Sequence, residues 1–203
     1  LNECEFWNNK ITNNLLHSLS ENRELSEKME FHSSIIKHIL HLFNKKEIKQ
    51  YNKIQYQLLN TIHSDSKQPI LIDSAKYIGR ALALNDIKQL DLKVIYVVRD
   101  VRGVINSFSK KVQTSKSPLS TIVYYLFVNS VAEFVARFFF RRKIIKIRYE
   151  DLIEQPIQLF DKLEKFINVD LSDIKEKIVN EQPFSVGHIV GGNRLKKNKD
   201  IYF

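Results

Sequence analysis

Hydrophobic residues change their spacing along the chain near residue 69. Between Glu21 and Leu59 they recur at helical intervals, and polar residues fill the other positions. The clearest apolar stripe consists of Ile35, Ile36, Ile39, Leu40 and Phe43. One apolar stripe of this kind predicts helix over 21–59.

Three short apolar runs, each bounded by polar residues, follow at 69–73, 93–98 and 143–149. Such runs are typical of strands buried on both faces of a parallel sheet. Helical patterns lie between the runs, at 79–90, 102–113 and 117–140. This alternation predicts a doubly wound α/β domain, in which ligands bind at the carboxyl ends of the strands.

The stretch from Leu119 to Phe140 is apolar and long enough to span a membrane. Asn129, Glu133 and Arg137 interrupt it, and a central charge costs about 2.5–3.5 kcal/mol on insertion scales. Glu133 and Arg137 also have the i, i+4 spacing of a helical ion pair. We therefore predict a long core helix and no membrane span.

The chain has 203 residues, which suits one domain over 1–203. Its five glycines and four prolines exclude long linkers and low-complexity repeats. The single cysteine, Cys4, excludes a disulfide framework and a multi-cysteine zinc site, and favours a reducing compartment. His38 and His41 are three apart, but no carboxylate or cysteine is in register, so we predict a helix surface and no metal site.

A net charge of +9 is typical either of a protein with an anionic partner (nucleic acid, a membrane surface, or a phosphorylated or sulfated small molecule) or of a lysine-rich solvated surface. A nucleic-acid-binding module would interleave aromatic and basic residues on exposed strands. Here the aromatics gather in apolar runs such as 138–140, which is typical of a core. The glycines, at 79, 103, 187, 191 and 192, exclude a Walker-type phosphate loop and a dinucleotide G-x-G-x-x-G fingerprint.

Residues 99–107, Arg-Asp-Val-Arg-Gly-Val-Ile-Asn-Ser, end the second run and open a helix. A guanidinium at Arg99 offers a bidentate fork to a phosphate, and the Ser107 hydroxyl can add a hydrogen bond. The alternative is that Arg99 pairs with Asp100 or Glu150 and that Ser107 is an ordinary helix residue.

Three further segments contain candidate residues. Asp73-Ser74 is a natural helix N-cap, and Lys76 either reaches an anion in the same crevice or is a solvated lysine. Residues 148–152, Arg-Tyr-Glu-Asp-Leu, are interpreted as a structural strand-to-helix corner. From His188 to Lys197, glycines beside basic residues form a loop that can close its backbone over a phosphate.

Together, the motifs IDSxK, VVRDxRxxxxS, RYEDL and HxxxGN, in that order, resemble sulfotransferases that depend on 3′-phosphoadenosine 5′-phosphosulfate (PAPS). The similarity covers residues 1–196 and is greatest to the bacterial and Golgi carbohydrate-type branch. The resemblance implies a three-layer, P-loop-NTPase-like α/β fold with a parallel sheet flanked by helices. It also implies PAPS as co-substrate, no metal, and a hydroxyl acceptor on a carbohydrate or small alcohol.

By this resemblance, Arg99 and Ser107 hold the 3′-phosphate of the nucleotide. Gly192, Asn193 and Lys196 belong to the loop that closes over it, although many relatives have Arg where this chain has Lys196. Lys76 adds positive charge. The predicted location is cytoplasmic, with the Golgi lumen as the alternative.

The opening residues resemble a Gly-Glu-x-x-x-Trp segment in which the acidic residue is the catalytic base. Glu3 is the better match and Glu5 the second choice, although Asn2 stands where relatives have glycine. A base here must take the proton of the attacking hydroxyl, so burial should raise its pKa.

One family feature, the Gly-x-x-Arg/Lys-Ser-Gly loop for the 5′-phosphosulfate, does not occur and would precede Leu1. We therefore expect a chain that lacks its N-terminal strand and loop, is cut at one or both ends, and is inactive or impaired by itself. Two alternatives stay open: a catalytically inactive α/β interaction scaffold, and a basic nucleic-acid-binding module.

Overall fold

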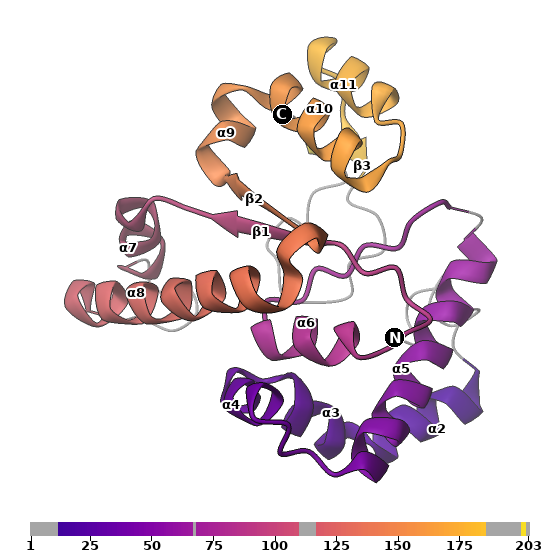
Figure 1. Cartoon of the computed structure of the whole chain (residues 1–203). Coiled ribbons are helices and arrows are strands. Elements are labelled where there is room, and N and C mark those ends of the chain that lie inside the picture. Colours follow the sequence, from indigo (N-terminus) through magenta and orange to yellow (C-terminus); the bar gives the residue numbers. More distant parts are fainter. Residues whose placement is uncertain (1–11, 67, 110–116, 186–199, 202–203) are drawn as a thin grey trace. The chain divides into compact units, whose positions relative to one another are not determined.

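The computed structural model describes residues 12–66, 68–109, 117–185 and 200–201. The chain forms two compact units. The helical unit takes in residues 1–92 and 185–201, and the sheet unit takes in 93–184 and 202–203. Figure 1 labels the elements of both.

The helical unit contains α2 (Asn13–Glu21), α3 (Arg23–Glu30), the 3₁₀ turn η1 (His32–Ser34), α4 (Ile35–Ile39), α5 (Lys45–Ser66) and α6 (Ile78–Asn85). Its core consists of Met29, Phe43, Tyr51 and Ala83, with Leu25 and Ile48 packed against it. The predicted apolar stripe is buried only in part: Ile35 and Phe43 are buried, whereas Ile36 and Leu40 are exposed.

The prediction of one continuous helix over 21–59 is wrong. The buried Ser34 hydroxyl donates to the carbonyl oxygens of Met29 (2.8 Å) and Phe31 (2.7 Å) beyond the end of α3. Serine side chains that bond to nearby backbone compete with helix in this way. A second break follows at His41, whose φ of 52° is left-handed.

His38 is buried, with only 7% of its surface exposed, so the prediction of a helix surface is wrong for it. Its Nε2 donates to the Met29 carbonyl oxygen at 2.8 Å, and its ring centroid lies 4.7 Å from that of Phe43. His38 is thus a hydrogen-bonded residue of the helical core.

Tyr51 supports a prediction about alkaline pH. Its hydroxyl, in a side chain 1% exposed, donates to Glu30 Oε1 at 2.9 Å, and burial is the main reason that its pKa is raised. An unfolded phenol ionises near pH 10. Above that pH the unfolded chain loses a proton that folded Tyr51 retains, so the free energy of unfolding falls as pH rises.

We expect Tyr51→Phe to cost about 1 kcal/mol at pH 8, where it removes one hydrogen bond. Its stability should then decline less between pH 8 and 11 than that of the unchanged protein. Urea titrations at the two pH values measure both effects. Equal declines in the two proteins would contradict a buried, protonated Tyr51.

The sheet unit begins with β1 (Val94–Val98), α7 (Val101–Ser109) and α8 (Pro118–Val135). The π turn η2 (Ala136–Phe140) and the 3₁₀ turn η3 (Arg141–Lys143) lead to β2 (Ile144–Arg148). Then come α9 (Tyr149–Glu154), α10 (Pro156–Ile167) and α11 (Ser172–Val179). Two further two-residue strands, β3 (Phe184–Ser185) and β4 (Asp200–Ile201), complete the described elements of the chain, and β4 belongs to the helical unit.

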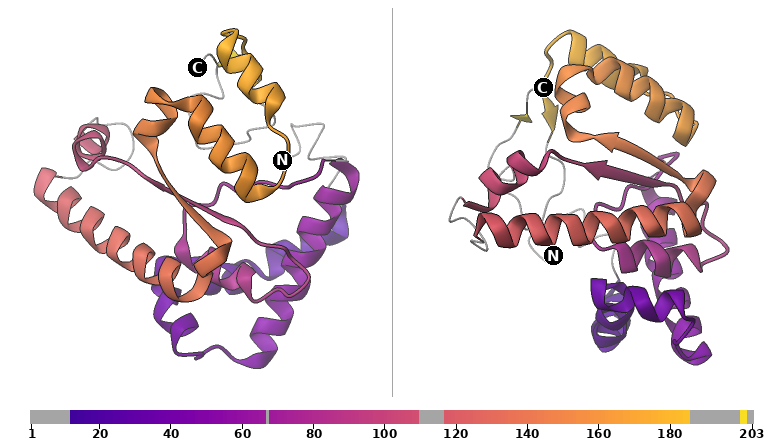
Figure 2. Two further views of the ribbon diagram at one scale, coloured as in Figure 1. Left: turned by 45° about the horizontal axis from the view of Figure 1, so that its top comes forward. Right: turned by 60° about the vertical axis from the view of Figure 1, so that its left-hand side comes forward.

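β1 and β2 pair in parallel, from Val94 opposite Ile144 to Val98 opposite Arg148. Helices lie on both sides of this pair: α8 on one side, and α9 and α10 on the other (Figure 1, Figure 2). On the α8 side, the Tyr96 hydroxyl of β1 donates to Asn129 Oδ1 at 2.6 Å. The expected parallel sheet between helices is thus observed for two of the three predicted strands.

The strand predicted at 69–73 is not observed. Residues 69–77 pair with no strand in the part of the chain that the structure describes, and Ile72 is 79% exposed. The expected N-cap at Asp73-Ser74 is also absent, because Tyr77 occupies the N-cap position of α6. Asp73 instead accepts from the Ala75 backbone N–H at 2.9 Å and from Arg80 Nε at 2.7 Å.

The apolar stretch is one long helical segment, but it is not a core helix. Residues Pro118–Lys143 are long and apolar enough to cross a membrane by length and composition, and only 11% of their most apolar window is buried. Phe127 is 66% exposed and Phe138 57% exposed. Glu133 pairs with Lys146 of β2, not with Arg137 as its spacing suggested.

Candidate functional site

The carboxyl end of β1 turns directly into α7, and Asp100 closes this turn. Its Oδ1 accepts from the Arg102 backbone N–H at 2.8 Å, as an N-cap carboxylate does. Hydrogen bonds from the Arg102 side chain and then from its backbone lower the pKa of Asp100 to about 2. Asp100 is therefore ionised at neutral pH and pairs with Arg102, not with Arg99.

Arg99 lies across the first turn of α7. A Cβ atom built on Gly103 would lie 2.9 Å from Arg99 Nε and 3.4 Å from its Cζ, so only glycine leaves room for the guanidinium there. Over the described ranges, Arg99 forms no ion pair, and its side chain is exposed. The alternative that Arg99 pairs with Asp100 or Glu150 is therefore not what the structure shows.

Ser107 shares this face of α7. It follows Gly103 by four residues, and residues four apart lie one above the other on a helix. Its side chain is exposed, as is that of Arg99. The structure thus brings Arg99 and Ser107 to one exposed helix face at the carboxyl end of a parallel strand.

The 148–152 corner contributes to this place more than the sequence indicated. The Tyr149 ring lies against the Arg99 guanidinium, with Cζ 4.7 Å from the ring centroid. Glu150 Oε1 accepts from the Asp100 backbone N–H at 2.9 Å, and this bond is the main reason that the pKa of Glu150 is lowered. Sequence reasoning missed Tyr149, although parallel pairing of the two strand ends was a signal for it.

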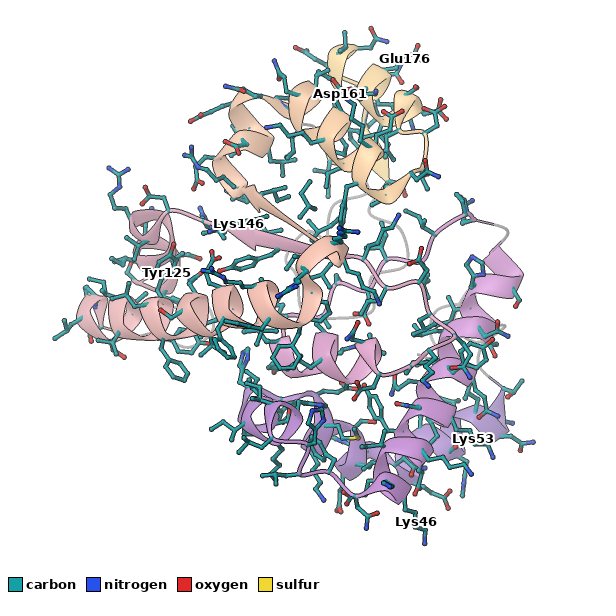
Figure 3. The ribbon with its side chains drawn as sticks, viewed as in Figure 1. Lys46, Lys53, Tyr125, Lys146, Asp161 and Glu176 are labelled. Atoms are coloured by element: carbon teal, nitrogen blue, oxygen red, sulfur yellow. The ribbon has the colours of Figure 1, made fainter. Side chains whose placement is uncertain are left out.

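A further contact comes from the other side of the sheet unit. Tyr125 of α8, labelled in Figure 3, donates its hydroxyl to the Arg99 carbonyl oxygen at 2.9 Å. The backbone of residues 99 and 100 is thus hydrogen-bonded to α8 and to α9. Neither of these bonds uses an N–H group of the Arg99 guanidinium.

Lys76 belongs to the helical unit, in the segment that precedes α6. It is exposed and forms no ion pair with any residue that the structure describes. Arg80 holds this segment: it bonds Asp73 through Nε and Glu30 through Nη1 at 2.6 Å. Sequence reasoning missed Arg80 because its partner Glu30 lies fifty residues away.

The other predicted site residues, Glu3, Gly192, Asn193 and Lys196, lie outside the described residues. Among the residues that the structure describes, no group of three or more His, Cys, Asp or Glu side chains could hold a metal ion.

The chain was also compared with known proteins. A family model for the sulfotransferase domain matches residues 63–185, which is more than half of the chain and includes Lys76, Arg99, Ser107 and Tyr149. No curated protein and no solved structure matches. The match runs through the 70–80 segment, both parallel strands and the 148–152 corner, and on this basis the chain belongs to the sulfotransferase family.

Proposed function

We propose that this protein transfers the sulfuryl group of PAPS to a hydroxyl group, on a carbohydrate or a small alcohol. Membership of the sulfotransferase family makes sulfuryl transfer the reaction class. The observation that supports PAPS as the donor is the exposed Arg99 guanidinium, which has no carboxylate partner among the described residues and lies on the same face of α7 as the Ser107 hydroxyl.

This arrangement suits the 3′-phosphate that distinguishes PAPS from common nucleotides. The guanidinium can donate two parallel hydrogen bonds to phosphate oxygens, and the serine can donate one more. The start of α7 adds the positive end of a helix dipole. The carboxyl end of a parallel strand is also where ligands bind in sheets of this class.

In the reaction itself, the acceptor oxygen forms a bond to sulfur as the bond from sulfur to the bridging oxygen of the 5′-phosphate breaks. The acceptor proton passes to a carboxylate, for which Glu3 is our candidate. Adenosine 3′,5′-bisphosphate is the leaving product. Like phosphoryl transfer, this displacement depends on positioning and on neutralising charge near the leaving oxygen.

From the sequence resemblance, we also propose that Lys76, Gly192, Asn193 and Lys196 bind the donor. Lys76 contributes a positive charge from a segment that the Arg80–Asp73 ion pair holds in place. For Gly192, Asn193 and Lys196, the proposal rests on the sequence resemblance: glycine and basic residues there close over the nucleotide.

The test is Arg99→Ala, assayed by calorimetry with adenosine 3′,5′-bisphosphate and the full-length protein. Removing a charged hydrogen-bond donor should weaken binding by about 1.5–3 kcal/mol, or roughly ten- to a hundredfold.

Arg102→Ala is the matched control. Arg102 is a neighbouring arginine in α7, but its side chain is 88% exposed and already paired with Asp100, so its removal should change the affinity little. If the Arg99 variant binds as tightly as the Arg102 variant, Arg99 does not hold the 3′-phosphate.

A further inference from the structure

The Arg99 guanidinium is held between two surfaces of the sheet unit. On one side is the Tyr149 ring, whose centroid lies 4.7 Å from Cζ. The other contact is the α7 backbone at Gly103, where an added Cβ would meet both Cζ and Nη2 at 3.4 Å. An arginine that is free in water samples many rotamers, whereas the Tyr149 ring and the α7 backbone restrict those of Arg99.

The strand register explains why Tyr149 is the residue that meets Arg99. Val98 and Arg148 are the last residue pair of the parallel ladder, so Arg99 and Tyr149 are the first residues after the two strands. One residue further on, the hydrogen bond from the Asp100 backbone N–H to Glu150 Oε1 joins the segments that follow the two strands.

A ring over the face of a guanidinium leaves the N–H edge available. The attraction is electrostatic, between the cation and the negative face of the ring, and it uses none of the five N–H donors. Since bidentate bonds to phosphate run in the guanidinium plane, a fixed plane is an oriented phosphate fork.

We propose that Tyr149 is a positioning residue for the donor, whose ring orients the Arg99 guanidinium toward the 3′-phosphate. This inference rests on the proposed function, since it assigns Tyr149 a role that acts only through Arg99. The ring, and not the phenolic hydroxyl, performs this role.

The experiment measures how much the 3′-phosphate contributes to affinity. Calorimetry gives the Kd for adenosine 5′-monophosphate and the Kd for adenosine 3′,5′-bisphosphate. The first Kd divided by the second is the factor by which the 3′-phosphate raises the affinity. Tyr149→Leu should lower this ratio about fivefold, within the range of cation–π energies. Tyr149→Phe should leave the ratio unchanged, because it keeps the ring.

A merely structural role for Tyr149 predicts a different result. Loss of packing would weaken both nucleotides alike, so an unchanged ratio in Tyr149→Leu overturns the inference. Tyr124→Leu, at a tyrosine of the same unit with a similar exposure of 39% against 36%, is the control for losing a ring. Circular dichroism checks folding, and Tyr149→Gln replaces the leucine variant if that variant does not fold.

Arg99→Ala separates failure of this inference from failure of the proposed function. If Arg99→Ala lowers the ratio and Tyr149→Leu does not, only the role of Tyr149 is wrong. If Arg99→Ala itself leaves the ratio unchanged, Arg99 does not bind the 3′-phosphate, and the proposed function loses its supporting observation. In the double variant, Tyr149→Leu should cause no further decrease in the ratio once Arg99 is absent, because it acts through that side chain.

Discussion

Replacing Arg80 with methionine should destabilise the helical unit by about 3 kcal/mol. The Arg80 side chain is 14% exposed and bonds Glu30, Asp73 and Gln55, at 2.6, 2.7 and 3.3 Å. Burial by itself would lower the pKa of this guanidinium, but the carboxylates of Asp73 and Glu30 outweigh it, and the pKa is raised. Without Arg80, the Glu30 carboxylate, 16% exposed, keeps its hydrogen bond from Tyr51 and loses its cation.

Urea unfolding monitored by circular dichroism measures this loss, with Arg23→Met as the control. Arg23 also forms an arginine–glutamate pair, with Glu27 at 2.8 Å, but its side chain is 79% exposed. Exposed i, i+4 pairs contribute about 0.3–0.5 kcal/mol, and arginine and methionine have similar helix propensities. Equal losses in the two variants would show that the Arg80 ion pairs contribute no more than a surface pair.

Arg80→Lys isolates the geometry of the network. Lysine keeps the charge but has one ammonium group, which cannot reproduce the planar fork between Asp73 and Glu30. It should therefore recover only part of the lost stability.

The two parallel strands could be predicted from their composition. Composition alone could not show that the third predicted strand, at 69–73, would not form. The runs at 94–98 and 144–148 are β-branched and have each other as partners, so their backbone groups are paired. The run at 70–72 has a similar composition and no neighbouring strand among the described residues. Apolar pattern reports the tendency to be buried, whereas a strand also requires a neighbour with free backbone groups.

The candidate site divides in the same way. Arg99 and Ser107 could be found from the sequence because their roles depend on local position, at a strand end and on one helix face. Tyr149 and Glu30 could not, because each meets its arginine through a long-range contact. Tyr149 follows from the strand register, and Glu30 follows from the packing of α3 against α6, which helical periodicity does not specify.

Gly79→Ala should cost about 2–4 kcal/mol, because α6 has no room for a side chain at this position. An added Cβ would lie 2.5 Å from the Glu30 carbonyl oxygen, 2.6 Å from that of Phe31 and 2.4 Å from Ser34 Oγ. Two of these atoms are backbone, and the Ser34 hydroxyl is fixed by its own hydrogen bonds. The helix must therefore move away from 30–34, which outweighs the gain of about 1 kcal/mol in helix propensity.

Gly103→Ala is the matched control for this change. It is the same substitution in a helix, but the atoms that its Cβ would meet are the far end of the Arg99 side chain, which can rotate away. Its free energy of unfolding should differ from that of the unchanged protein by less than about 1 kcal/mol. If Gly79→Ala proves as stable as Gly103→Ala in parallel urea titrations, the close packing of α6 on residues 30–34 is wrong. A loss confined to Gly79→Ala would show that backbone contact, and not the loss of glycine in a helix, limits this position.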